Sequence, residues 1–311
     1  MIKRKMLDSF SILLCLIFCL TSCYYGKEKY ITVVVREPGS GTREAFDRIV
    51  TDGEHYLEEE DENGKKKDHT AISAVVQTKN GTLLSSVATD RYAIGYVSLG
   101  SVNDRVKVLS INGVFPTEES VLNGSYRIRR PFVIMTRASG DLQVRTADFL
   151  SYLQSNLAKQ HVQSADCIYL SDPLLRGGEG GDPIPESIYH QKNTLPGEGK
   201  IVIRGSTSVE RLINSAAAAY AAMYGVPAQD VFDIRLEGTS VGRRAVEDDQ
   251  EGNVIGLSSA SVSSAQIKCF YICYDAVAVI VNVDSLAPPN LTLSQVYDIF
   301  SGRTVKFSEI G

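Results

Sequence analysis

The chain has 311 residues, of which 43% are hydrophobic and 22% charged, and its formal net charge is −5. This composition is typical of a soluble globular protein and excludes general disorder, which requires a low apolar content. The negative charge disfavours a nucleic-acid binder, because such proteins usually present a basic surface. The length suffices for one large core or two moderate ones.

The first 23 residues differ in character from the rest. Lys3, Arg4 and Lys5 precede an apolar run over residues 10–20 that is too short to span a bilayer and has the length of a signal-peptide core. The run ends in Leu-Thr-Ser-Cys, which resembles the lipobox of bacterial lipoproteins. We expect residues 1–23 to be a lipoprotein signal peptide, with lipid on Cys23 holding the protein at the extracytoplasmic face of the cell membrane; an uncleaved anchor is the alternative.

Three cysteines would remain beyond this segment: Cys167, Cys269 and Cys273. The last two share an apolar run and, if that run is a strand, lie roughly 13 Å apart, too far for a disulfide. We expect buried thiols. The four histidines lie elsewhere in the chain, so the sequence predicts no metal site, and it indicates no cofactor.

In chain order, the first elements are a strand at Tyr30–Arg36, a Gly-Ser-Gly-Thr turn at 39–42 and a helix at Arg43–Val50. The charged stretch Glu54–His69 reads as a solvated loop or hairpin. A helical turn at 83–88 and strands at 93–99 and 130–135 follow.

Further along, a helical region covers 144–153, and residues 171–199, rich in Gly and Pro, predict a long loop. Two strand–turn–helix units come next: a strand at 201–204 with a helix from Val209, and a strand at 232–237 with a helix from Arg243. Strands alternating with helices predict an α/β fold with mainly parallel sheets.

Three of these strand-to-helix turns are built from Gly, Ser and Thr. A helix N-terminus carries unpaired N–H groups and a partial positive charge, glycine permits close approach, and hydroxyls add hydrogen bonds. One such turn has a purely structural explanation as a helix cap. Three of them, with Arg36 just before the first, indicate an oxyanion held by converging helix ends.

Several motifs resemble the solute-binding proteins of phosphate-specific ABC transporters. The matching pieces are Arg36–Thr42 (REPGSGT), Ile94–Tyr96 (IGY), Gly205–Val209 (GSTSV), Ile255–Ser259 (IGLSS), Val279–Asn282 (VIVN), and 291–302. The resemblance implies a two-lobed fold of the type II periplasmic-binding-protein kind, with mixed, mainly parallel sheets and a two-strand hinge. It also implies a binding protein rather than an enzyme, monomeric, with phosphate as ligand and the permease subunits of an ABC transporter as partners.

Carried over residue by residue, the resemblance implies that one lobe grips the anion with Arg36, Ser40, Gly41 and Thr42. The other lobe would use Ser206, Thr207, Ser208, Thr239 and Ser259. Arg36 would supply the formal countercharge, and charge-assisted bonds of this kind are strong.

The chain departs from the family at two acidic positions. Many members have Asp where Pro38 stands, and some have Asp where Ser259 stands. A carboxylate there accepts the proton of hydrogen phosphate and repels sulfate, and only Glu37 is nearby in this sequence. Sulfate, molybdate or tungstate therefore remain alternative ligands, and a sensor without a transport role is an alternative function.

The motif order also differs, because the family places the Gly-Ser-Thr-Ser turn before the Gly-Ser-Gly-Thr turn. We interpret the chain as circularly permuted; a truncated or fused gene is the alternative. One lobe would then be continuous over 136–275, and the other would combine 30–130 with 277–311. The crossovers would be 131–135 and 276–282, with Gly311 ending near Tyr30.

A serine hydrolase is a remote alternative, because residues 238–242 fit the nucleophile elbow Gly-x-Ser-x-Gly around Ser240. That fold places its catalytic histidine after the serine. Here all four histidines precede Ser240.

Overall fold

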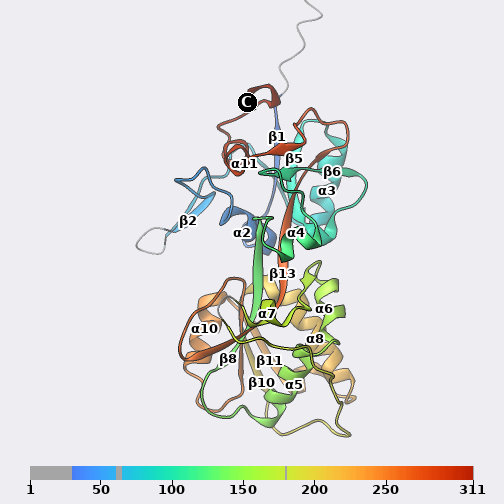
Figure 1. Cartoon of the computed structure of the whole chain (residues 1–311), viewed down its shortest axis with the longest axis vertical. Coiled ribbons are helices and arrows are strands. Elements are labelled where there is room, and N and C mark those ends of the chain that lie inside the picture. The colour runs from blue at the N-terminus through green and yellow to red at the C-terminus, as the bar shows by residue number, and fades with distance from the viewer. Residues whose placement is uncertain (1–29, 61–64, 179–180, 311) are drawn as a thin grey trace, which may run out of the picture.

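The computed structural model describes residues 30–60, 65–178 and 181–310. The predicted signal peptide, Cys23 and Gly311 lie outside the described residues. The chain forms two α/β lobes, one above the other in Figure 1, and the strands β8 (Arg129–Arg137) and β13 (Ile267–Asn282) run between them. The predicted two-lobed α/β fold is thereby confirmed.

A mixed sheet passes through both lobes in the strand order β11-β10-β12-β8-β13-β5-β1-β4. In the first lobe, β1 (Thr32–Arg36) pairs in parallel with β4 (Val75–Gln77) and β5 (Ala93–Ser98). In the second lobe, β10 (Ile201–Gly205) pairs in parallel with β11 (Phe232–Leu236) and β12 (Val254–Ser258). The antiparallel strands β8 and β13 join these two parallel sets.

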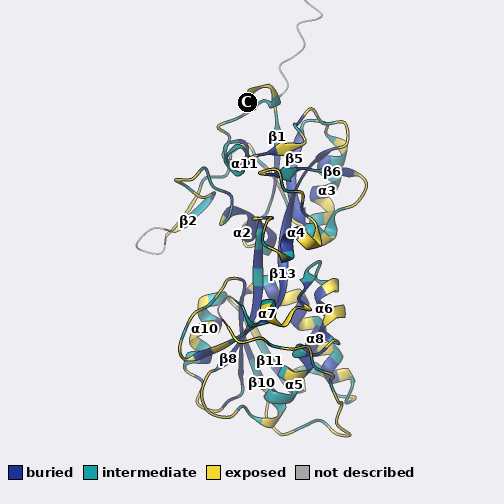
Figure 2. Ribbon diagram, in the orientation of Figure 1, coloured by how far each residue is buried: buried dark blue, intermediate teal, exposed yellow. Residues whose placement is uncertain are grey.

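The strand β13 is longer than the predicted crossover at 276–282. Its 16 residues are mostly β-branched or aromatic and almost all buried, so a continuous strand satisfies both its side chains and its backbone. The first part of β13 pairs with β8, and the last part pairs with β5 and with β6 (Val106–Val108). Figure 2 shows both connecting strands as predominantly buried.

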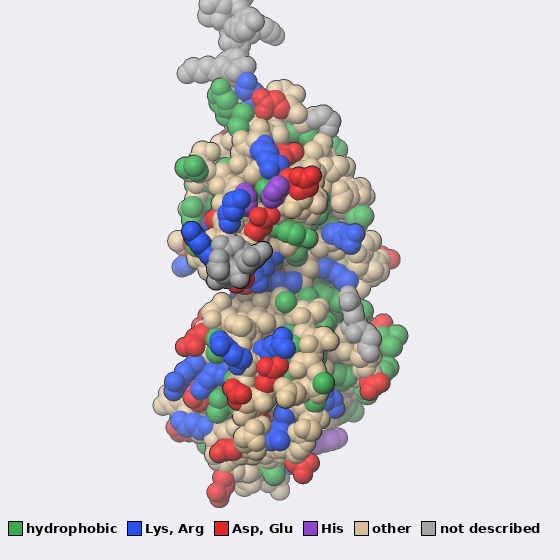
Figure 3. All heavy atoms as spheres, turned by 90° about the vertical axis from the view of Figure 1, so that its left-hand side faces the viewer, with side chains coloured by type: hydrophobic (Ala, Val, Ile, Leu, Met, Phe, Trp, Pro, Cys, Tyr) green, Lys and Arg blue, Asp and Glu red, His purple; other side chains and the backbone are tan. Residues whose placement is uncertain are grey.

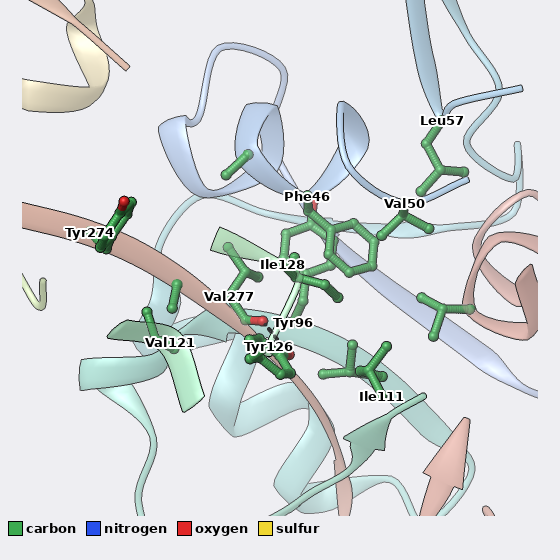
Figure 4. Packing of buried hydrophobic residues seen from close by; sticks show 14 of the residues in the cluster. Phe46, Val50, Leu57, Tyr96, Ile111, Val121, Tyr126, Ile128, Tyr274 and Val277 are labelled. Atoms are coloured by element: carbon green, nitrogen blue, oxygen red, sulfur yellow. Dashed lines mark hydrogen bonds between the residues drawn. The ribbon is translucent and has the colours of Figure 1, made fainter. Parts of the chain in front are cut away.

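The first lobe is built from both ends of the described chain. Its helices are α2 (Gly41–Asp47), α3 (Asn80–Thr89), α4 (Glu118–Leu122) and α11 (Leu293–Phe300). Phe46 stacks on Tyr96 with ring centroids 4.0 Å apart and meets Phe300 edge-on at 4.7 Å (Figure 4 shows Phe46 and Tyr96). Ile31 donates its N–H to the carbonyl of Val305, which places the described ends side by side.

The first lobe also contains several smaller elements. They are β7 (Ser110–Ile111) paired with β14 (Asn290–Leu291), the 3-10 helices Leu99–Ser101 and Phe307–Glu309, and a hairpin of β2 (Glu58–Glu60) with β3 (Lys66–Asp68). The hairpin carries the acidic and basic runs of the charged stretch. The loop-or-hairpin prediction therefore resolves to a hairpin over the described residues.

The second lobe has its own apolar cluster, drawn from residues between Phe132 and Cys273. Its helices are α5 (Val144–Gln154), α6 (Ala158–Ser164), α7 (Pro173–Gly177), α8 (Glu210–Ala222), α9 (Ala228–Val231) and α10 (Thr239–Glu247); β9 (Ile168–Tyr169) pairs with β13. The stretch predicted as a loop over 171–199 thus contains a helix, α7. Asp172 caps it and Pro173 occupies its first position.

Candidate functional site

The turn after β1 leads directly into α2. Ser40 is the N-cap, and its Oγ accepts a hydrogen bond from the backbone N–H of Arg43 at 3.5 Å. Gly41 and Thr42 form the first turn of the helix, where backbone N–H groups lack intrahelical partners. The sequence pattern therefore places a donor-rich helix start at the carboxyl end of a central strand, where α/β sheets commonly bind ligands.

The second lobe supplies two more turns of this kind. After β10, Ser206 caps the 3-10 helix Thr207–Val209 that leads into α8. After β11, Gly238 adopts a positive φ and α10 begins at Thr239, four residues earlier than the predicted Arg243. The side chains of Ser206 and Ser259 hydrogen-bond at 2.9 Å, and the Ser259 N–H donates to Thr239 Oγ1 at 3.4 Å.

A small cavity of about 220 Å³ lies between the lobes. Its lining includes Arg36, Ser40, Gly41 and Thr42 from the first lobe, with Thr207 and Ser208 from the second. A larger cavity of about 740 Å³ is lined by Ser206, Thr207 and Thr239 among others. Thr207 borders both cavities, and Ser259 lines neither of them.

The Arg36 guanidinium is engaged by neighbours of its own lobe. Its Nε and Nη2 donate to the two carboxylate oxygens of Glu37 at 2.9 and 3.0 Å, and its Nη1 donates to Asn80 Oδ1 at 2.5 Å. Burial is the largest single effect on the pKa of Glu37 and works to raise it, but the hydrogen bond from Arg36, a backbone hydrogen bond and the charges of Arg36 and Arg43 together lower the pKa. Glu37 therefore stays ionised and neutralises part of the positive charge that an anion would use.

A second arginine in the small cavity, Arg130, was missed by the sequence analysis. It stands directly opposite Asp275 on the paired strands β8 and β13, with Nε and Nη2 each 3.4 Å from Asp275 Oδ2. Arg130 also donates to the carbonyl of Gly41. Both side chains are at least nine-tenths buried, and desolvation raises the pKa of Asp275 despite the nearby guanidinium.

A detectable signal for this pair existed in the sequence. Asp275 interrupts a run of apolar strand residues, and Arg130 stands directly before another such run. A charge in such a position requires a buried partner or a ligand. Asn80 carries no comparable signal, because it is a polar residue at the start of α3, where such residues are common.

The lobes touch at Ser208 and Asp166, two residues that line the small cavity. Ser208 Oγ donates to Glu44 Oε2 at 3.2 Å, and Ser101 Oγ donates to Asp166 Oδ2 at 3.0 Å. Within the second lobe, Arg211 Nη1 forms an ion pair with the same carboxylate oxygen of Asp166 at 2.8 Å. Figure 3 shows a narrow waist at this level, with Lys and Arg side chains beside it.

The described residues give little support for a metal site, a serine hydrolase or a membrane-spanning helix. No group of three His, Cys, Asp or Glu side chains in the described ranges is arranged to hold a metal ion. His161 is hydrogen-bonded to Tyr152 and Ser215, and His69 to Glu59, rather than to Ser240. Within the same ranges, no helix has the length and apolarity needed to cross a bilayer.

Two α/β lobes enclosing a small, polar cavity characterise the periplasmic-binding-protein class. A sequence profile of the PBP superfamily domain matches residues 24–156 and 191–309. The phosphate-binding protein PstS 2 of Streptococcus agalactiae serotype V is 33% identical over 284 residues, covering 90% of this chain and 87% of that protein. PstS 2 of Streptococcus pneumoniae serotype 4 is 32% identical over 283 residues, with the same coverage.

A solved structure gives the same result. The crystal structure of a phosphate-binding protein of a phosphate ABC transporter from Streptococcus pneumoniae TIGR4 is 31% identical, with a TM-score of 0.74. The match covers 91% of this chain and all of that one. The chain therefore belongs to the PstS family of phosphate-binding proteins of ABC transporters, as the motifs predicted.

Proposed function

We propose that this protein captures inorganic phosphate between its two lobes and delivers it to an ABC transporter. The observation that carries the proposal is the small cavity, where the helix starts at Ser40 and Thr207 converge from opposite lobes beside Arg36. Its volume of about 220 Å³ is below the ~300–1,000 Å³ typical of pockets for drug-sized ligands. A small tetrahedral oxyanion is the ligand class that suits it.

We propose that the anion is bound by the nine residues named from the sequence: Arg36, Ser40, Gly41, Thr42, Ser206, Thr207, Ser208, Thr239 and Ser259. Arg130 joins them as a second source of positive charge. Ser206, Thr239 and Ser259 support the Thr207 turn through their mutual hydrogen bonds. The Arg36 guanidinium binds the anion when its hydrogen bonds to Glu37 are replaced by hydrogen bonds to the ligand.

The cellular setting is part of the proposal. Lipid on Cys23 would tether a monomeric protein to the extracytoplasmic face of the membrane, where permease subunits receive the anion. The assignment rests on the Leu-Thr-Ser-Cys motif and on the names of the relatives, which are phosphate-binding proteins.

One observation favours a different oxyanion as an alternative to phosphate. Position 259 contributes a hydroxyl, which accepts a hydrogen bond from Ser206, where some relatives place a carboxylate. A site without that proton acceptor discriminates poorly against sulfate, so sulfate, molybdate and tungstate stay in the test.

We further propose that the lobes, 30–130 with 277–311 and 136–275, move about β8 and β13 to admit the anion. The motif order would be a native circular permutation. In support of a native order, the alignment with the Streptococcus agalactiae protein spans most of both chains.

The test is calorimetry of the mature chain with phosphate, sulfate, molybdate and tungstate. Arg36→Ala should weaken phosphate binding by roughly 2–5 kcal/mol, because a buried anion loses its charged partner. The matched control is Arg235→Ala, since Arg235 is exposed on the second lobe. Unchanged phosphate affinity in Arg36→Ala would show that the site is wrongly assigned.

A further inference from the structure

A chain of hydrogen bonds runs from the Arg36 guanidinium through the first lobe to the second lobe. Arg36 Nη1 donates to Asn80 Oδ1 at 2.5 Å, and Asn80 Nδ2 donates to Ser101 Oγ at 3.2 Å. Ser101 Oγ then donates to Asp166 Oδ2 at 3.0 Å, and this last bond joins the two lobes. Arg36, Asn80 and Asp166 all line the small cavity. The chain therefore follows the wall of the proposed anion site.

The chemistry of the two ends determines the direction of every bond in this chain. A guanidinium can only donate, so the amide of Asn80 turns its oxygen towards Arg36 and its nitrogen towards Ser101. An ionised carboxylate can only accept, so the Ser101 hydroxyl donates to Asp166. All the donors thus point from a positive end towards a negative end, an order in which neighbouring bonds polarise and strengthen one another. Breaking one bond should weaken the others.

The chain holds one side of the Arg36 guanidinium and leaves another side free to exchange partners. Asn80 accepts from Nη1, whereas Nε and Nη2 donate to the two carboxylate oxygens of Glu37 at 2.9 and 3.0 Å. Two parallel N–H groups of this kind also form bidentate pairs with phosphate oxygens. When phosphate replaces Glu37, the bond to Asn80 keeps the plane of the guanidinium in place.

An uncommon backbone conformation places Asp166 for its part in the chain. Asp166 follows the end of α6 with a φ of 61°, and Asn112 is the other non-glycine residue with positive φ in the described parts of the chain. Glycine adopts this conformation readily, and Asp is one of the few other residues that tolerate it. The Asp166 side chain adds what glycine lacks, because its Oδ2 accepts from Ser101 and pairs with Arg211 Nη1 at 2.8 Å.

The two lobes also approach each other by their backbones at this place. Gly100 precedes Ser101 in the 3-10 helix Leu99–Ser101. A Cβ added at Gly100 would lie 2.8 Å from the carbonyl oxygen of Asp166 and 2.9 Å from its Cα, which is closer than van der Waals contact allows. Glycine therefore lets Ser101 reach Asp166. Because these two residues belong to opposite lobes, the bond between them breaks when the lobes separate.

We propose that Asp166 is a positioning residue for the anion site. Through Ser101 and Asn80 it holds the Arg36 guanidinium in the orientation that receives the anion, and it does so only while the lobes are closed. Lobe closure and anion binding thereby reinforce each other. This role rests on the proposed function, because the chain acts on the site assigned to phosphate.

The experiment measures phosphate affinity by calorimetry for the mature chain and for Ser101→Ala. Loss of this hydroxyl breaks the chain in its middle and should weaken phosphate binding roughly tenfold, the size of effect expected for hydrogen bonds linked to charged groups. Gly100→Ala keeps every hydrogen-bonding group but obstructs the interlobe contact, so it should weaken binding comparably. Ser86→Ala is the matched control, because the Ser86 hydroxyl accepts from Gln77 Nε2 at 3.0 Å within the first lobe. The phosphate affinity of this control should equal that of the parent.

A double substitution distinguishes positioning from simple adhesion between the lobes. In Asn80→Ala, Arg36 is already disconnected from the Ser101 hydroxyl, so adding Ser101→Ala should reduce affinity by a smaller factor than it does in the parent. An undiminished further loss in the Asn80→Ala background would overturn the positioning role.

The positioning role and the proposed function fail in different ways. Phosphate binding that is weakened in Arg36→Ala but unchanged in Ser101→Ala would refute the positioning role and leave the proposed function intact. A parent protein that binds none of the four tested anions would refute both.

Discussion

Gly41 gives the sharpest test of how closely the two lobes approach. A Cβ added at this position would lie 2.9 Å from Ser208 Oγ and 3.0 Å from Ser208 Cβ on the opposite lobe, and 3.1 Å from Arg130 Nη2. These separations are tighter than ordinary van der Waals contact. In Gly41→Ala the lobes must stay a few tenths of an ångström further apart, and overpacking of this kind costs about 1–3 kcal/mol. Phosphate affinity should therefore fall roughly 5- to 150-fold.

The same substitution should not harm the fold. Gly41 is the first residue of α2, its φ is not positive, and alanine keeps the backbone N–H that the anion would use. Gly81→Ala is the matched control, because Gly81 is in α3 and a Cβ there meets nothing within 4 Å. Calorimetry with phosphate and thermal melting of both variants separate binding from stability. Equal phosphate affinities for the two variants would refute the close approach of Gly41 to Ser208.

Three further predictions concern charge. Arg130→Ala should lower the free energy of unfolding by about 3–5 kcal/mol, because the buried Asp275 loses its charged partner and keeps the hydrogen bond from Ser98; urea denaturation measures this loss, and an unchanged midpoint would contradict it. Burial lowers the pKa of His161, so the stability contributed by its neutral form is present above pH ~6.5 and is lost as the pH falls. The melting temperature of His161→Gln should therefore fall less than that of the parent when the pH is lowered below ~6.5. With no Asp at positions 38 and 259, sulfate should compete with phosphate more strongly than in relatives that keep these carboxylates; calorimetric competition showing strong rejection of sulfate would assign the proton-accepting role to another acid.

The sequence was informative where local chemistry determines structure. The turn over residues 39–42 has its glycine, its cap and its helix start within a few positions, and α2 begins as that pattern requires. The turn over 205–209 is similar. In both cases the donor groups belong to the same short segment that forms the turn, so spacing along the chain is enough to find them.

The sequence was weaker where a residue depends on a distant partner. Arg130 and Asp275 are 145 positions apart, and only the pairing of β8 with β13 brings them together. The bond between Arg36 and Glu37 links adjacent residues, yet its competition with the anion becomes evident only when Asn80 is seen on the other side of the guanidinium.

The way the first lobe is assembled has a consequence for protein synthesis. Its core requires Phe46, made early, and Phe300, made almost last. The apolar cluster of the second lobe needs only residues between 132 and 273. During vectorial synthesis or export, the second lobe can therefore complete its core before the C-terminal part of the first lobe has been made. We expect the usual order, in which N-terminal units fold first, to be reversed in this chain.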